Sequence, residues 1–242
     1  MVAYAEKCFT YQRRQPQFTP CYKIVQEHLA TFIHEREAEG RPLPRYITEE
    51  FEHFLKCGIL SHGFIRLKCS HCSEEKIVAF SCKKRGFCPS CAAKRMVESA
   101  AHLVENVLPI APYRQFVISF PVPLRFCFQT NKKLYAHVHK IVISEIHRYY
   151  ENKAKSLGVK VPLHGTISYT QRFGSALNLN QHIHCLALDG VFSDVAGHLR
   201  FHNTAAISDQ EVAILITQIS SNVMAYLKKK SLLNEDGEIV QN

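Results

Sequence analysis

The chain has 242 residues, 46% of them hydrophobic, and carries a formal net charge of +9. Its length and apolar content suffice for one large domain or two small ones, and its basic balance favours a polyanionic partner. No apolar run approaches the roughly 20 residues of a membrane-spanning helix, and the N-terminal residues lack the pattern of a secretory signal. We therefore expect a cytoplasmic protein without membrane contacts, whose ten cysteines bind metal or are buried and do not form disulfides.

The first half of the chain consists of helical segments around a cysteine-rich stretch. Apolar residues at helical spacing predict three helices, over residues 20–37, 47–58 and 92–107. Between the second and the third helix the periodicity weakens, and cysteines and basic residues gather. Pro109 and Pro112 follow and mark a boundary.

The second half mixes strands with helices. Strands are predicted over residues 114–120, 164–173, 181–190 and 198–201. Asp189–Gly190 predicts a tight turn after the third of them. Long helices are predicted over residues 131–158 and from Ser208 onward, where Ser208 and Glu211 have the spacing of a capping box. This order of elements predicts an α+β fold, in which strands with packed helices follow a helical, cysteine-rich segment.

The cysteine-rich stretch has the spacing of a zinc site. Cys69-x-x-Cys72 is followed, after fifteen residues, by Cys88-x-x-Cys91. Each pair presents two thiolates on one side of a tight turn, and two such pairs complete a tetrahedron around one ion. We therefore predict a structural zinc ion on these four cysteines.

Other residues of the same stretch have open roles. Cys57, His62 and Cys82 could bind a second metal ion, replace one of the four ligands, or be buried. From Lys56 to Arg95 there are nine Lys or Arg against two Glu. Cations on a loop that zinc holds in place are well positioned to neutralise phosphates. We predict nucleic-acid contacts by Lys83, Lys84, Arg85, Lys94 and Arg95.

A pair of histidines interrupts the third predicted strand. His182 and His184 flank Ile183, and residues two apart on a strand point to the same face, about 7 Å apart along the backbone. Both imidazoles can therefore reach one ion, although two hydrogen-bonded core histidines would give the same pattern. The preceding amides, Asn180 and Gln181, favour a site because polar groups are costly in a core strand. Imidazole with amide oxygens suits magnesium or manganese at a phosphate group.

Three long motifs carry a resemblance to a known family. They are AFSCKKRGFCPSCAAKRM, RQFVISFPVPLRF and QRFGSALNLNQHIHCLALDGVF, in this order. The chain resembles the insertion sequence 91 family of transposases, single-strand DNA transposases of the HUH nuclease class, from about Thr19 to Leu233. In that class HUH denotes two histidines that flank a hydrophobic residue, which here are His182 and His184.

The resemblance implies a bacterial, nucleoid-associated protein of DNA transposition with two domains. Residues 1–108 would form a helical and zinc-binding DNA-recognition domain, and residues 109–242 an HUH nuclease-like catalytic domain with an antiparallel sheet, incomplete at its C-terminus. The partners implied are single-stranded DNA and element-end hairpins. His182 and His184 would hold magnesium or manganese at the scissile phosphate, which a tyrosine attacks to form a 5′-phosphotyrosine link.

Two positions depart from the family's pattern. Some relatives have a further histidine two residues before the pair, where this chain has Asn180, so the candidates for a third ligand are Asn180, Gln171 and Gln181. Tyr226 is the candidate nucleophile in the last helix, but it lies beside the apolar stripe. We expect the catalytic tyrosine of the family beyond Asn242.

Two alternative functions remain open. One is a non-catalytic, zinc-containing DNA-binding protein, or a truncated transposase that lacks the nucleophilic tyrosine. The other is a metal-dependent nuclease that uses water as the nucleophile, for which the sequence shows no cluster of Asp and Glu. We interpret Asp189 as structural because it lies in a predicted turn.

Overall fold

The computed structural model describes residues 14–72, 74–84 and 86–233. The chain divides into two compact units, Met1–Pro109 and Ile110–Asn242. Each unit has a hydrophobic core of its own.

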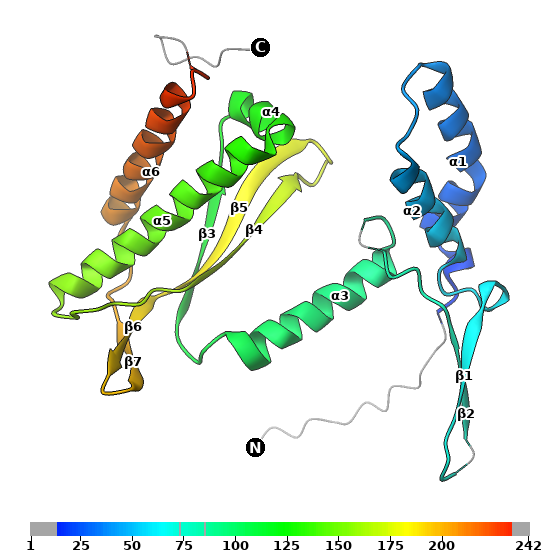
Figure 1. The fold of residues 1–242 in the computed structure, drawn as a ribbon, viewed down its shortest axis with the longest axis horizontal. Helices are drawn as coiled ribbons and strands as arrows, with labels where there is room; N and C mark the ends of the chain where they lie inside the picture. The colour runs from blue at the N-terminus through cyan, green and yellow to red at the C-terminus, as the bar shows by residue number, and fades with distance from the viewer. Residues whose placement is uncertain (1–13, 73, 85, 234–242) are drawn as a thin grey trace. The chain divides into compact units, whose positions relative to one another are not determined.

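The first unit is helical apart from one β-hairpin. In chain order it holds η1 (Pro16–Phe18), α1 (Pro20–Ala38), α2 (Arg45–Lys56), η2 (Leu60–His62), β1 (Phe64–Lys68), β2 (Glu75–Ala79), α3 (Pro89–His102) and the π-helical turn η3 (Leu103–Val107), as Figure 1 shows. Thr19 caps α1, because its side chain accepts the backbone N–H of Tyr22. Pro20 follows at the first helical position, where a missing N–H costs no hydrogen bond.

The core of the first unit is small. Tyr22 of α1 contacts Phe54 of α2, and Phe87 meets the Phe54 ring edge-on with 4.9 Å between the ring centroids. Two cysteines, Cys57 and Cys88, belong to the same buried cluster. So small an apolar core supplies little stability, and a metal ion bound at its edge can supply more.

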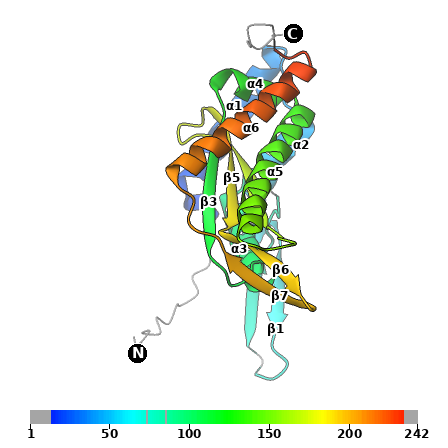
Figure 2. The same ribbon diagram turned by 90° about the vertical axis from the view of Figure 1, so that its left-hand side faces the viewer.

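The second unit combines a three-stranded sheet with helices. It holds β3 (Tyr113–Ser119), α4 (Val122–Thr130), α5 (Lys132–Ser156), β4 (Thr166–Phe173), β5 (Leu179–Leu188), β6 (Gly190–Val195), β7 (His198–Asn203) and α6 (Asp209–Lys229). β5 lies between β3 and β4 and runs antiparallel to both, while β6 and β7 form a separate hairpin. α5 lies along the sheet and α6 packs beside α5 (Figures 1 and 2).

The core of the second unit lies on one face of this sheet. Ile183 and Cys185 of β5 are fully buried in the same cluster as Val138, Val142 and Ile146 of α5. Because side chains alternate along a strand, His182 and His184 point to the opposite face. The histidines therefore occupy the sheet face that the helical layer leaves uncovered.

The predicted α+β class is confirmed by the helices and the antiparallel sheets. The capping box of α6 is also present, since the Ser208 side chain accepts the Glu211 N–H and Glu211 accepts the Ser208 N–H. No helix among the described residues is both long and apolar enough to cross a membrane.

The predicted tight turn at Asp189–Gly190 is wrong. The chain bends there into β6, which pairs with β7 and not with β5. A Cβ atom on Gly190 would collide with the carbonyl oxygen of His202 on β7, so glycine is required by the close approach of two backbones.

Candidate metal centres

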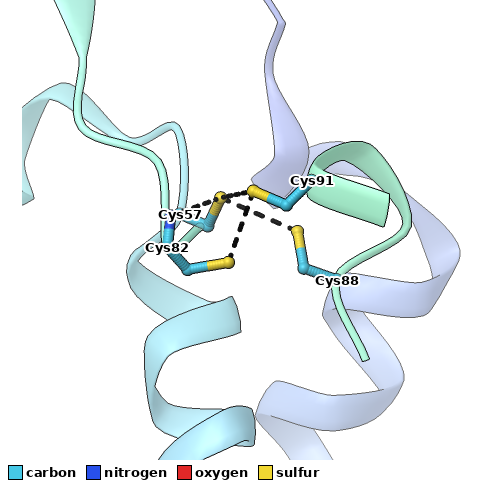
Figure 3. A group of neighbouring side chains, drawn as sticks. All are labelled: Cys57, Cys82, Cys88 and Cys91. Atoms are coloured by element: carbon cyan, nitrogen blue, oxygen red, sulfur yellow. Dashed lines mark hydrogen bonds between the residues drawn. The ribbon is translucent and has the colours of Figure 1, made fainter. Parts of the chain in front are cut away.

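Four cysteines converge at the edge of the core of the first unit (Figure 3). They are Cys57, Cys82, Cys88 and Cys91, and their sulfur atoms all lie within 4.8 Å of one another. The Sγ of Cys91 lies 3.6 Å from that of Cys57 and 3.4 Å from that of Cys82. Cys57 and Cys88 are buried, and the other two are half-buried.

Two local structures bring these cysteines together. The β1–β2 hairpin closes at its base, where Gly58 N–H bonds to the Phe80 carbonyl and Phe80 N–H to the Gly63 carbonyl. This closure places Cys57 and Cys82 side by side. Cys88 is the N-cap of α3, and Cys91 lies in its first turn. Residues three apart at the start of a helix lie on the same side, so these two sulfur atoms come together.

The cysteine set differs from the one that the spacing predicts. Cys69 and Cys72 lie at the tip of the hairpin, beyond the Lys68–Glu75 pair, and both are exposed. Five residue pairs separate the tip from the base, a length of about 13 Å at the usual strand rise. The hairpin therefore keeps Cys69 and Cys72 away from Cys88 and Cys91. Cys57 and Cys82, and not Cys69 and Cys72, complete the group with Cys88 and Cys91.

The group of four fits a zinc ion. Zinc–sulfur bonds of about 2.3 Å in a tetrahedron place neighbouring sulfur atoms about 3.8 Å apart, close to the distances in this group. Burial raises the pKa of the Cys57 and Cys82 thiols, so a cation is needed to hold thiolates there. Once bound, zinc would link the hairpin base, the end of α2 and the start of α3.

The spacing of the cysteines favoured Cys69 and Cys72 as zinc ligands. Spacing alone does not reveal the two strands, β1 and β2, that carry this pair away from the other cysteines. The signal that could have found the other pair is the apolar character of Phe64–Leu67 and Ile77–Phe80 on either side of the tip. Two such runs predict a hairpin, and a hairpin brings together the residues just outside it, which are Cys57 and Cys82.

The predicted DNA contacts lie beside this group. Lys83 and Lys84 directly follow Cys82, and Lys94 and Arg95 lie on α3. Arg95 donates a hydrogen bond to the Lys83 carbonyl, which ties the loop to the helix. Lys83 and Lys94 are exposed. The Arg85 prediction lies outside the described residues.

The second candidate centre is the face of β5 that carries His182 and His184. The two imidazole centroids are 4.9 Å apart. Tyr169 on β4 pairs with His184 across the sheet, and its ring stacks on the imidazole at 5.1 Å with an interplanar angle of 8°. The Gln115 side-chain nitrogen lies 3.1 Å from His184 Nδ1. Tyr169 and Gln115 were not predicted, although alternation along their strands would place them on this face.

Hydrogen bonds at Nδ1 orient both imidazoles, and for His182 the bond fixes the tautomer. His182 Nδ1 lies 2.6 Å from the Asn180 carbonyl oxygen and donates to it, which leaves the lone pair on Nε2. An imidazole that binds metal through Nε2 carries its proton on Nδ1. At His184 the Gln115 nitrogen faces Nδ1, so metal binding there would require a half-turn of the Gln115 amide, which would present its oxygen to that proton. Among the residues that the structure describes, His184 Nε2 and Asn180 Oδ1 are buried polar atoms that find no hydrogen-bond partner.

The three candidates for a third ligand lie in different places. Asn180 is on the same face of β5 as the histidines, and its side-chain oxygen is buried and has no hydrogen-bond partner among the described residues. Gln171 pairs with His182 across the sheet, but it is exposed and its side-chain nitrogen bonds to the Phe173 carbonyl. Gln181 is buried and points to the opposite face. Of the predicted ligands, His182, His184 and Asn180 therefore share one face of β5, and Gln171 lies beside them on β4.

Tyr226 is not brought to the histidines. Its ring stacks on His137 of α5 at 3.9 Å, and it packs against the core cluster. That cluster occupies the other face of the sheet, where Ile183 and Cys185 point. The prediction of Tyr226 as nucleophile is therefore not supported by the geometry. The reason is that Tyr226 flanks the buried stripe of Leu215, Ile219, Val223 and Leu227.

Comparisons with known families match both units. A family model described as a transposase zinc-binding domain, of insertion sequence 91 elements, matches residues 24–120. A model described as a putative transposase matches residues 165–241. No curated protein and no solved structure matches the chain. The first match contains the four-cysteine group and the second contains the histidine pair, in the order that the resemblance implied. The chain therefore belongs to the insertion sequence 91 family of transposases.

Proposed function

We propose that this transposase binds single-stranded DNA at the ends of a mobile element and cuts and rejoins it with a divalent metal ion held on β5. One observation carries the proposal. In the described part of the chain, His184 Nε2 and Asn180 Oδ1 are buried without a hydrogen-bond partner, on the same strand face as His182. Unpaired buried polar atoms cost free energy, and a bound cation would satisfy both of them.

Each residue of the site has a specific task. His182 and His184 would bind magnesium or manganese through their Nε2 atoms, and Asn180 through its side-chain oxygen. When bound, the ion would supply Lewis-acid chemistry at the scissile phosphate. The Asn180 carbonyl and Gln115 would orient the two imidazoles, and the stacked ring of Tyr169 would hold His184 in place.

The strand transfer itself needs a tyrosine nucleophile. Its oxygen forms a bond to phosphorus as the bond between phosphorus and the 3′ oxygen breaks, and the 3′ oxygen takes up a proton. The resulting 5′-phosphotyrosine keeps a phosphodiester bond, so attack by another 3′ hydroxyl reverses the step without a further energy source.

The first unit would hold the DNA. Its four-cysteine group would keep zinc as a structural ion, and Lys83, Lys84, Lys94 and Arg95 would face the phosphates of a single strand or an element-end hairpin. Such contacts release counterions, so binding would weaken steeply as salt rises.

A second candidate function is favoured by the placement of Tyr226. Its ring lies in the helical layer, so Tyr226 is not placed to attack a phosphate at the histidines. The chain could then be a zinc-containing DNA-binding protein without catalytic activity.

The metal site is tested by titration with manganese, followed by the loss of the free Mn²⁺ signal in electron paramagnetic resonance. We expect the chain to bind Mn²⁺ on the histidine face and the variant His182→Ala/His184→Ala to lose this binding. His198→Ala is the matched control, because it removes an exposed imidazole from β7 of the same unit. Equal Mn²⁺ binding by all three proteins would contradict the site.

The chemistry is tested with labelled single-stranded DNA that carries element ends, in the presence of Mn²⁺, on a denaturing gel. A covalent protein–DNA adduct that requires His182 and His184 supports tyrosine-mediated transfer. Cutting without an adduct means that water is the nucleophile. DNA binding without any cutting supports the non-catalytic alternative.

A further inference from the structure

Tyr169 carries an exposed aromatic ring beside the histidine pair. It lies on β4 directly across from His184 of β5, and its ring stacks on the His184 imidazole at 5.1 Å with an interplanar angle of 8°. The His184 imidazole lies in turn 4.9 Å from that of His182. The three rings thus form a row across the sheet, and Tyr169 is the end of this row on β4.

The outer side of the Tyr169 ring faces solvent. β4 is an edge strand of the sheet (Figure 1), and in the described part of the chain it pairs with β5 alone. Because one side of the ring faces His184 on β5, the other side points toward the unpaired edge of β4. The side chain is 58% exposed. An aromatic plane is therefore accessible next to the histidines.

The surroundings of this ring suit a nucleotide. The strands β3, β4 and β5 contain no Asp or Glu, so this face has no carboxylate that would repel a phosphate. Gln171, two residues along β4, and Gln115 on β3 are both exposed. Side-chain amides of this kind pair with the edges of bases. Charge and polarity around the ring therefore favour a nucleic acid over a protein as the partner of Tyr169.

We propose that the outer side of the Tyr169 ring stacks on the nucleobase next to the scissile phosphate of single-stranded DNA. The inference rests on the proposed function, which places this phosphate at His182 and His184. A base is joined to its phosphate through one sugar, so the adjoining base lies on the surface that surrounds the histidines. The Tyr169 ring is the exposed aromatic plane in contact with His184.

The contact makes Tyr169 a positioning residue. A base that is stacked on the ring fixes the nucleotide whose phosphate faces the metal site. Stacking accepts any base because every base has a π-face, so the contact selects a place along the strand and not a sequence. It also selects single strands, because the bases of a duplex already stack on one another and offer no free plane to the ring.

Photo-crosslinking tests the contact on the whole chain. The probe is a single-stranded oligonucleotide of mixed sequence with iodouracil in place of thymine, because this base links on irradiation to an aromatic ring that is stacked on it. The linked residues are identified by mass spectrometry of peptides. We expect a link to Tyr169 in the wild type, a link to the new ring in Tyr169→Phe, and no link at this position in Tyr169→Ala. The same oligonucleotide paired with its complement should give no link at Tyr169.

Affinity for the same oligonucleotide is the second measurement, by fluorescence anisotropy. It is made without added Mn²⁺, so that a weaker metal site in the variants does not contribute. Loss of one stacked base weakens binding by about 5–100-fold, which we expect for Tyr169→Ala and not for Tyr169→Phe. Phe126→Ala is the matched control, because it removes an exposed aromatic ring from α4 of the same unit, and it should bind as the wild type does.

Two results would overturn the proposal: links to other residues but none to Tyr169, or equal affinity of Tyr169→Ala and wild type. A chain that binds no single-stranded DNA would overturn it together with the proposed function. The Mn²⁺ titration separates the two in the remaining cases. Mn²⁺ binding and cutting without a link at Tyr169 would keep the proposed function and reject the stacking. A link at Tyr169 in a chain that binds no Mn²⁺ would keep the stacking and reject the metal-dependent function.

Discussion

At the scale of single residues, the orientation of His184 depends on Tyr169. The tyrosine ring covers one side of the imidazole at 5.1 Å and nearly parallel to it. Aromatic contacts of this kind contribute about 0.5–1.5 kcal/mol, which corresponds to a change of about 2–10-fold in affinity. We predict that Tyr169→Ala weakens Mn²⁺ binding by about this factor, measured by electron paramagnetic resonance titration.

The control for this prediction is Tyr169→Phe, which keeps the ring and removes the hydroxyl. It should bind Mn²⁺ as the wild type does. Equal losses in both variants would show that the hydroxyl acts, and not the ring. If Tyr169→Phe keeps Mn²⁺ binding but loses a protein–DNA adduct, the phenol itself is the nucleophile.

The sequence predicts individual residues where the local geometry is simple. His182 and His184 share a face because strand alternation is a property of neighbouring residues, and the same rule places Asn180 with them. The zinc ligands depend on a hairpin that joins residues 25 positions apart, Cys57 and Cys82. Spacing alone could not show which cysteines meet, because it favours the closest pairs along the chain.

At the scale of elements, Asp189 connects three parts of the second unit. Its carboxylate accepts hydrogen bonds from Arg114 of β3 at 2.7 Å and from Tyr150 of α5 at 3.0 Å, and it lies where β5 ends and β6 begins. Its interpretation as structural rather than catalytic agrees with these bonds. Burial alone would raise the pKa of Asp189, but the bonds from Arg114 and Tyr150 outweigh it and lower this pKa.

A lowered pKa in the folded state makes stability depend on pH in a defined direction. The carboxylate of Asp189 contributes stability at pH values above its unfolded pKa of 3.8, and this contribution is lost as the pH falls through the folded pKa. We predict that Asp189→Asn lowers the free energy of unfolding at pH 7 by about 1–3 kcal/mol. The difference from wild type should shrink in acid, as measured by urea unfolding across pH.

Asp194→Asn is the control for the Asp189 prediction. Asp194 is exposed on β6 and accepts the N–H of Gly197, a bond that an asparagine oxygen can also accept. Its unfolding free energy should match the wild type at each pH. A constant difference between Asp189→Asn and wild type down to pH 2 would contradict a role for the ionised carboxylate.

Elements with strong periodicity were predicted, and three elements without it were missed: α4, β6 and the β1–β2 hairpin. The long helices and β5 follow from apolar stripes that extend over several turns or pairs. α4 was missed because Pro121 precedes it and Pro123 lies in its first turn, so the segment reads as irregular. β6 was missed because it continues from β5 without a turn residue other than Gly190. The β1–β2 hairpin was missed because its apolar residues lie on both faces and give no alternation.

At the scale of the whole molecule, the two units obtain their stability from different sources. The second unit buries a continuous core that extends from Phe120 to Leu227. The first unit buries few apolar side chains, and two residues of its core cluster, Cys57 and Cys88, belong to the four-cysteine group. Zinc at this group would therefore stabilise the first unit alone, because binding free energy at a structural site becomes folding free energy.

Removal of zinc should unfold the first unit and leave the second folded. We predict that a chelator increases amide hydrogen exchange in α1, α2 and the hairpin, whereas α5 and β5 stay protected, as measured by mass spectrometry of peptides. Cys88→Ser should have the same effect without a chelator, and Cys127→Ser, in a half-buried position on α4, should leave the first unit protected. Unchanged exchange in the first unit after full zinc loss would contradict a structural role for the ion. Loss of protection in both units would show that they fold as one.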